Sequence, residues 1–271
     1  GQIFAGASRA TGTYANANHL AGLLEMSLPF ALAMTAQAVE RRRVLSIIPA
    51  AACCVLIFAS LLYTLSRAGF AGAIVAIAVL AGLLASGKER RRRALAAFAI
   101  LAVFAAILFL AVPNQLLDRL ADTDGDVLPD VRFQIWRETL RLIGAYPVFG
   151  CGLGTYVSAI QQYRVSSTPI ALVDYAHSDY LQLLAEWGFV GFAPALAFAL
   201  LLLSRGLRGA ATAGRRDQRW LPAACFAGLV ALAIHSFADF NLYIPVNAMV
   251  AAWIAGIIAG LNLSTGQAPD S

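Results

Sequence analysis

Seven apolar runs constrain what this chain can fold into more than any other feature. They cover residues 19–39, 44–65, 68–86, 94–112, 180–203, 220–237 and 243–261. Each has about the length, roughly 17 to 25 residues, that a helix needs to cross a bilayer. With 60% hydrophobic and only 13% charged residues, the chain is too apolar to be soluble as a monomer. The sequence therefore predicts an all-α fold, a polytopic bundle of about seven transmembrane helices.

The chain reads as a single transmembrane domain over residues 1–271, with no internal repeat and no separate soluble domain. Its first residue is Gly1 rather than Met, and the opening segment lacks the apolar core of a signal peptide. We therefore expect further helices upstream of this sequence. The four cysteines show no disulfide pattern, because most of them lie within apolar runs.

The basic residues indicate how the bundle is oriented. Of the 20 Lys and Arg residues, 13 fall in the connections after the first, third and fifth runs, at residues 41–43, 88–93 and 205–219. Basic residues gather in cytoplasmic loops, so these connections are predicted inside and the others outside. The long segment 113–178 then becomes an extracytoplasmic loop. Since topology accounts for the net charge of +5, no nucleic acid partner is indicated.

Three features of the outer loop suggest local structure. The acidic run 122–126 resembles a calcium loop, but its glycine is misplaced and Phe133 stands where a bidentate Glu is needed, which favours a solvated turn. Asp130 can cap an amphipathic helix over residues 131–145, whose apolar face is Phe133, Trp136, Leu140 and Ile143. The glycine run 150–154 lacks the flanking strand of a dinucleotide site; it is either flexible backbone that closes over a substrate or an ordinary turn.

The polar stretch 174–188 precedes and enters the fifth apolar run, where acidic residues and His are costly. If a helix begins near Ser178, its N-terminal amides lower the pKa of His177 and favour the neutral ring, which can act as a base. Asp179, Gln182 and Glu186 share one helical stripe, and His177 points elsewhere. Under the predicted topology His19, His177 and His235 all lie at outer helix ends, with Asp239 nearby. We therefore predict a shared cleft there.

Arginines at the outer side have two interpretations. Arg67 opens the third run, and Arg9 and Asn18 lie just before or at the start of the first. An arginine guanidinium suits phosphate oxygens, but an arginine at this depth can also snorkel to lipid headgroups.

These motifs together resemble the O-antigen ligase and polymerase-like family of bacterial envelope enzymes. The residues that carry the resemblance are Arg9-x-x-Gly12 with Asn18, Ser66-Arg67-Ala68-Gly69, Arg132-x-x-x-Trp136, Tyr146-Pro147-x-x-Gly150-x-Gly152-x-Gly154, His177-x-x-Tyr180-Leu181-Gln182-x-x-x-Glu186-x-Gly188 and Asp239-x-x-Leu242-x-x-Pro245. The family usually has His-Asn where this chain has His177-Ser178.

The resemblance implies an inverting, metal-independent glycosyltransferase without a cofactor. Its donor would be a glycan on undecaprenyl diphosphate, and its acceptor a lipid, a glycan or a protein. His177 is similar to the family's base, and Arg67 and Arg132 to its diphosphate-binding arginines. Arg9, Asn18, Glu186, His235 and Asp239 are further candidates for substrate binding. The implied location is the bacterial inner membrane, with the active site facing the periplasm.

The alternative function is a multi-pass transporter, similar to relatives that carry inorganic carbon. A transporter is expected to place polar groups near the bilayer midplane. Here the polar groups concentrate at the outer helix ends, which favours the enzyme.

Overall fold

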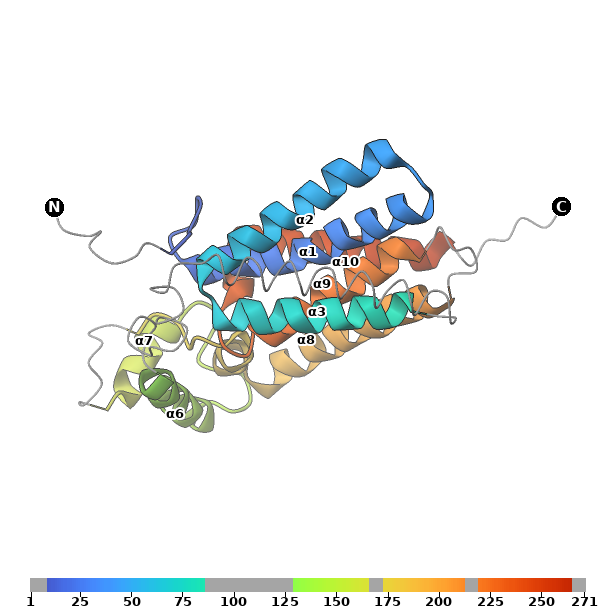
Figure 1. The fold of residues 1–271 in the computed structure, drawn as a ribbon. Helices are drawn as coiled ribbons and strands as arrows, with labels where there is room; N and C mark the ends of the chain where they lie inside the picture. Colours follow the sequence, from blue (N-terminus) through green and yellow to red (C-terminus); the bar gives the residue numbers. More distant parts are fainter. Residues whose placement is uncertain (1–8, 86–128, 166–172, 213–218, 265–271) are drawn as a thin grey trace.

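The computed structural model describes residues 9–85, 129–165, 173–212 and 219–264, and these residues are helical with no strand among them. Helices α1, α2, α3, α8, α9 and α10 lie along a common direction, and α6 and α7 lie together at one end of this bundle (Figure 1). The helices are α1 (Ala17–Glu40), α2 (Val44–Thr64), α3 (Arg67–Leu84), α6 (Pro129–Ala145), α7 (Tyr156–Ile160), α8 (Asp179–Thr212), α9 (Trp220–His235) and α10 (Pro245–Ser264). Two 3-10 turns, Gln161–Tyr163 and Asn241–Tyr243, complete the described elements.

The predicted all-helical membrane architecture is confirmed, whereas the count of seven spans stays a prediction. Among the described residues, four helices, α1, α2, α3 and α8, are long and apolar enough to cross a bilayer. The sixth and seventh predicted spans form shorter apolar helices, Trp220–His235 and Pro245–Gly260. The fourth predicted span, residues 94–112, lies outside the described residues, as do the acidic run 122–126 and much of the predicted outer loop.

Small residues bring α1, α3 and α9 into close contact. A side chain added at Gly69 of α3 would overlap Ala21 of α1, and one added at Gly72 would meet Glu25 and the backbone of Ala231 in α9. Alanines of the same three helices form one buried cluster. Without a hydrophobic drive inside lipid, close packing of this kind is a main source of helix association.

Helix α8 is interrupted at Gly188, which has φ 60° and ψ −173°. The interruption leaves backbone groups that pair with the segment 147–152, here called the glycine strap. The amides of Cys151 and Gly152 donate to the carbonyls of Ala185 and Glu186 at 2.9 and 3.1 Å, and the amides of Phe189 and Val190 donate to the carbonyls of Pro147 and Val148 at 2.8 and 3.1 Å. The glycine strap therefore docks on the break in α8, a role that neither sequence interpretation of the glycine run included.

Helix α6 is the predicted amphipathic helix, but it begins earlier than predicted and packs on the protein through a different face. The helix begins at Pro129, so Asp130 lies within its first turn instead of preceding it as a cap. Phe133 and Leu140, predicted on one apolar face, are exposed, whereas Glu138 is buried. The inward face follows a different stripe because it packs on Tyr156 and Ile160; its members are Val131, Ile135, Thr139 and Leu142.

Glu138 tolerates burial because α6 is held to the segment after α7. Its carboxylate accepts a hydrogen bond from the Val165 amide at 2.7 Å and lies 3.4 Å from Nε of Arg164. Next to it, the hydroxyls of Thr139 and Tyr156 are 2.7 Å apart. These contacts hold α6 and α7 together as one unit.

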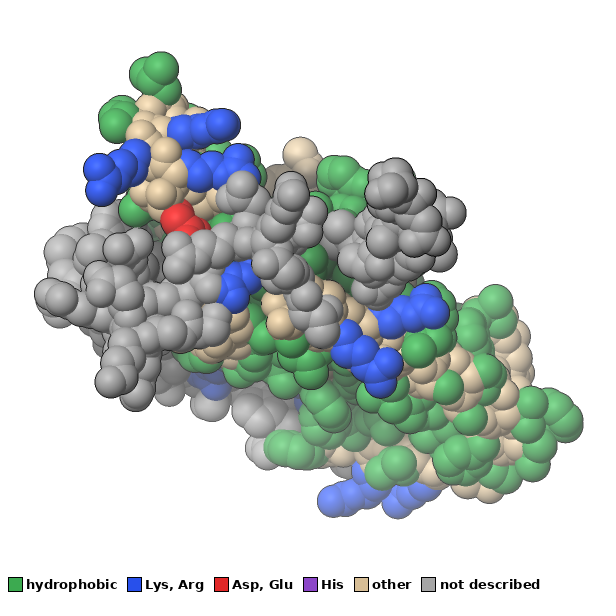
Figure 2. All heavy atoms as spheres, turned by 90° about the vertical axis from the view of Figure 1, so that its right-hand side faces the viewer, with side chains coloured by type: hydrophobic (Ala, Val, Ile, Leu, Met, Phe, Trp, Pro, Cys, Tyr) green, Lys and Arg blue, Asp and Glu red, His purple; other side chains and the backbone are tan. Residues whose placement is uncertain are grey.

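The two ends of the bundle differ in charge. Figure 2 looks onto one end, over which Arg side chains are spread. Its described basic residues are Arg41, Arg42, Arg43, Arg205, Arg208 and Arg219, which belong to two of the connections predicted to be cytoplasmic. His19, His177 and His235 lie at the opposite end, near the start of α1, before α8 and at the end of α9.

Candidate active site

Four ionisable side chains form a row through the end of the bundle that holds the histidines. Nδ1 of His235 lies 3.0 Å from Oε1 of Glu25, and its Nε2 lies 3.8 Å from Oδ2 of Asp239. The other oxygen of Asp239 lies 3.7 Å from Nε2 of His19. Acid and imidazole therefore alternate in the order Glu25, His235, Asp239, His19, and all four side chains are buried. We call this set the acid–histidine row.

Phe240 connects the acid–histidine row to His177. The rings of His19 and His177 both meet Phe240 edge-on, with centroid distances of 4.9 and 5.3 Å. Tyr175 stacks on the same ring at 4.1 Å. His177 is half-buried, in contrast to His19 and His235. It is thus the most accessible of the three histidines.

The backbone and surroundings of His177 set its orientation and its charge. Its φ of 49° is left-handed, which is uncommon for a residue other than glycine and turns the chain sharply before α8. Burial lowers the pKa of His177, Arg132 and His19 lower it further, and Asp239 and Asp174 oppose them. The pKa of His177 is thus lowered, as the sequence predicts, but the leading cause is burial instead of the helix N-terminus.

Asp239 lies in the connection between α9 and α10, where it is almost fully buried. Burial would raise the pKa of Asp239, but the neighbouring rings of His19 and His235 and the Phe240 amide outweigh it and lower the pKa. The Phe240 amide donates to Oδ1 of Asp239 at 2.8 Å. Asp239 therefore carries a negative charge close to His177.

The predicted stripe on α8, Asp179, Gln182 and Glu186, is hydrogen-bonded to other residues of the protein. Ser236 donates to Asp179 at 2.7 Å, and the amide of Leu242 donates to the same carboxylate. Glu186 accepts hydrogen bonds from Gln182 at 3.1 Å and from the Tyr243 hydroxyl at 2.8 Å. The stripe thus fastens α8 to the α9–α10 connection, which carries Asp239.

Arg9 and Asn18, both predicted to bind substrate, bind each other. Nε of Arg9 donates to the carbonyl of Thr64 at 2.7 Å, and a terminal nitrogen donates to Oδ1 of Asn18. Asn16 caps α1 by accepting from the Asn18 amide at 2.9 Å. The bond from Arg9 to Thr64 links the segment before α1 to the end of α2, three residues before Arg67.

Arg67 and Arg132 stand in different surroundings. Arg67 is the first residue of α3 and is exposed, next to Ser66, whose hydroxyl caps the helix. Arg132 is half-buried in the first turns of α6, and its charge acts on His177. Its Nε has no hydrogen-bond partner among the described residues.

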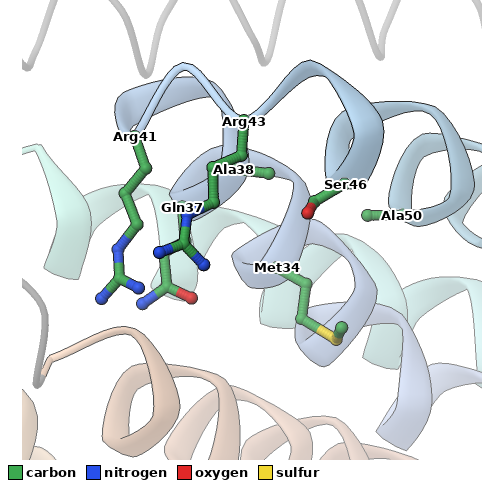
Figure 3. A pocket seen from close by; sticks show the side chains of 7 residues that line it. All are labelled: Met34, Gln37, Ala38, Arg41, Arg43, Ser46 and Ala50. Atoms are coloured by element: carbon green, nitrogen blue, oxygen red, sulfur yellow. The ribbon is translucent and has the colours of Figure 1, made fainter.

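A pocket lies at the opposite, basic end of the bundle, between the end of α1 and the start of α2. Figure 3 shows the side chains of Arg41 and Arg43 extending past Gln37 there. Its lining is completed by Met34, Ala38, Ser46 and Ala50. None of the residues predicted for the site lines this pocket. Within the described ranges, no group of three or more His, Cys, Asp and Glu side chains could hold a metal ion.

The sequence did not assign Glu25, Tyr175 or Phe240 to the site. Glu25 could have been found from its occurrence within an apolar run, because an ionisable residue there needs a partner. Tyr175 and Phe240 carry no comparable signal, since aromatic residues are common near membrane surfaces.

A comparison with models of protein families shows which family the sequence matches. The family model described as O-Antigen ligase matches residues 52–196. This match covers more than half of the chain and includes Arg67, Arg132, His177 and Glu186. The chain belongs to the O-antigen ligase family. No curated protein matches it.

Membership in the O-antigen ligase family indicates glycan transfer in a membrane, with lipid-linked glycan substrates. The comparison gives no support to the transporter that the sequence left as an alternative. Arg9, Asn18, His235 and Asp239 lie outside the matched range.

Proposed function

We propose that this protein is an integral-membrane glycosyltransferase that moves or polymerises a glycan from an undecaprenyl-diphosphate donor onto a lipid, glycan or protein acceptor. The observation that carries this proposal is the match to the O-antigen ligase family across Arg67, Arg132 and His177. Lipid-linked substrates of this family suit a site at the end of a membrane bundle.

His177 is the proposed base. A general base must be neutral and must reach the acceptor hydroxyl. His177 is half-buried and has a lowered pKa, whereas His19 and His235 are enclosed. In the proposed step His177 takes the proton of the acceptor hydroxyl, whose oxygen attacks the anomeric carbon. The bond from that carbon to the diphosphate oxygen breaks, and undecaprenyl diphosphate leaves with the electron pair, which inverts the anomeric centre.

The leaving diphosphate needs positive charge, which Arg132 and Arg67 are proposed to supply. Arg132 is close enough to lower the pKa of His177, and its Nε lacks a partner among the described residues. Arg67 is exposed at the start of α3. Two guanidinium groups can stabilise the developing charge without a metal ion.

The negative charge of Asp239 then has a clear task. After proton transfer His177 becomes cationic, and Asp239 favours this form more strongly than Asp174 does. Stabilising the charge that develops in the transition state is a large source of rate acceleration. We propose that Asp239, the residue before Phe240, stabilises the cationic form of His177 in this way. We also propose that Glu186, Arg9 and Asn18 shape the cleft around the substrate.

The proposed location is the bacterial inner membrane, with the site facing the periplasm. Support for this orientation comes from the basic end of the bundle, which the positive-inside rule assigns to the cytoplasm.

The test replaces His177 with Gln, which keeps a similar size and hydrogen-bonding capacity but has no useful basicity. The purified protein is placed in liposomes with a lipid-linked oligosaccharide extracted from bacterial membranes, and product is followed by gel mobility. We expect His177→Gln to insert normally and bind the donor, with transfer reduced about 10²- to 10⁴-fold.

The matched variants are His19→Gln and His235→Gln, which should lose less activity. Retention of most activity in His177→Gln, together with its loss in His235→Gln, would move the base to His235. Movement of a solute across the liposome membrane without any glycan transfer would show that the protein is a transporter instead of an enzyme.

A further inference from the structure

Glu25 is an acidic residue that the proposed reaction does not use. It lies within α1, and its side chain is fully buried. An ionisable group inside a membrane bundle is costly, so its presence calls for a specific partner or task.

The surroundings of Glu25 are shaped to hold its carboxylate. Oε1 lies 3.0 Å from Nδ1 of His235, whose ring is also fully buried. On the side of α3, Gly72 leaves room for the carboxylate, because a Cβ at Gly72 would lie 2.5 Å from Oε2 of Glu25. Three helices therefore define one position for this side chain.

This position fixes the ring of His235 with respect to Asp239. A hydrogen bond at one ring nitrogen of a histidine sets both the tautomer and the direction of the other nitrogen. With Nδ1 directed at Glu25, Nε2 of His235 faces Oδ2 of Asp239 at 3.8 Å. Asp239 in turn contacts His19 and acts electrostatically on His177.

We propose that Glu25 is a positioning residue for glycan transfer: through His235 it holds Asp239 in place beside the proposed base His177. This inference rests on the proposed function of the same site. Glu25 itself lies too deep to touch a substrate, so its effect must pass through the acid–histidine row.

The test compares two substitutions. Glu25→Gln keeps an acceptor for the ring nitrogen but removes the charge, whereas Glu25→Met removes both and retains a similar volume. We expect kcat to fall about tenfold or more in Glu25→Met and less in Glu25→Gln, with the KM for the lipid-linked oligosaccharide unchanged. Ser27→Ala is the matched control, because Ser27 lies on the same helix and its hydroxyl donates to the Leu23 carbonyl of that helix at 2.8 Å.

A double-mutant cycle tests the route through His235. If Glu25 acts through that ring, Glu25→Met should cost little more in a His235→Gln background than His235→Gln costs alone. Additive losses, or a rise in KM at constant kcat, would overturn the inference.

A spectroscopic measurement separates this inference from the proposed function. Nitrogen-15 NMR of the ring of His235, identified by its loss in His235→Gln, should change in Glu25→Met and stay constant in Ser27→Ala. An unchanged His235 signal would refute the positioning role in an active protein. If the His235 signal changes in Glu25→Met as expected but the wild-type protein transfers no glycan, the proposed function is refuted, whereas the positioning of the His235 ring by Glu25 stands. If Glu25→Met does not accumulate in the membrane, the same signal change, of smaller size, is expected in Glu25→Gln, and its absence there refutes the inference.

Discussion

The break in α8 makes the chain sensitive to one substitution, Gly188→Ala. Gly188 has φ 60°, and an added Cβ would overlap the backbone nitrogen of Gly150 and the carbonyl of Val148. Because both neighbours are backbone atoms, no side-chain rotation can relieve the overlap. Gly188→Ala must therefore separate the glycine strap from α8.

The cost of Gly188→Ala has two parts. The φ of 60° and ψ of −173° at Gly188 lie in a backbone region that is essentially restricted to glycine, and alanine there costs about 1–3 kcal/mol. The four backbone hydrogen bonds between the glycine strap and α8 are each worth about 0.5–1.5 kcal/mol, and separation puts them all at risk. We expect a loss of about 3 kcal/mol or more, which corresponds to a fall in Tm of roughly 6–12 °C for a domain of this size.

The assay is thermal unfolding of purified protein in detergent, with transfer activity measured in parallel. Gly144→Ala in α6 is the matched control, since no heavy atom lies within 4 Å of a Cβ added there. Activity should fall in Gly188→Ala at temperatures where the protein is still folded, because α6 with Arg132 shifts relative to His177. A Tm equal to that of Gly144→Ala would show that the docking of the glycine strap contributes nothing to stability.

Three further predictions concern the charges of the site. Arg67→Lys keeps the charge and the ability to reach lipid but loses the two-pronged donor geometry; transfer should fall roughly tenfold or more at normal membrane levels, and wild-type turnover would assign Arg67 to lipid contact. Arg132→Gln removes a positive charge that lowers the pKa of His177. That pKa should therefore rise. Since the base works only when neutral, activity should be lost at a higher pH in the variant than in the wild type when the pH is lowered, and a pH–rate profile with an unshifted acid limb would contradict the coupling. Chelation should leave transfer intact, because arginines supply the charge at the diphosphate, and loss in EDTA restored by magnesium would contradict this.

The first three helices were predictable from the sequence nearly to the residue. The predicted run 44–65 became α2, Val44–Thr64, because basic residues precede it and Ser66 caps the next helix. The shared end of the three histidines also followed from the sequence, since the parity of the spans determines on which side each helix terminus lies. Local composition is sufficient for both inferences.

Contacts between distant segments were not predictable. Glu25 and His235 are 210 residues apart, and nothing local to either one indicates the other. The buried face of α6 could not be predicted for the same reason: a helical wheel places Glu138 on the polar side, but Arg164 and the Val165 amide pair with it and permit its burial. The break in α8 also depends on the glycine strap, which lies some 40 residues earlier in the chain.

The pairing of Glu25 with His235 has a consequence for synthesis of the protein. With a mean hydropathy of 1.3, α1 is the least apolar of the four described candidate spans. Glu25 lies in its third turn, where an acidic residue opposes insertion by up to about 2.5–3.5 kcal/mol, the cost at a helix centre. Its partner is translated 210 residues later, which at typical ribosome speeds is a wait of roughly 10 to 40 s. During that interval the carboxylate of Glu25 lacks the ring that neutralises it, so α1 depends on a protonated Glu25, on neighbouring helices or on an insertase until α9 emerges.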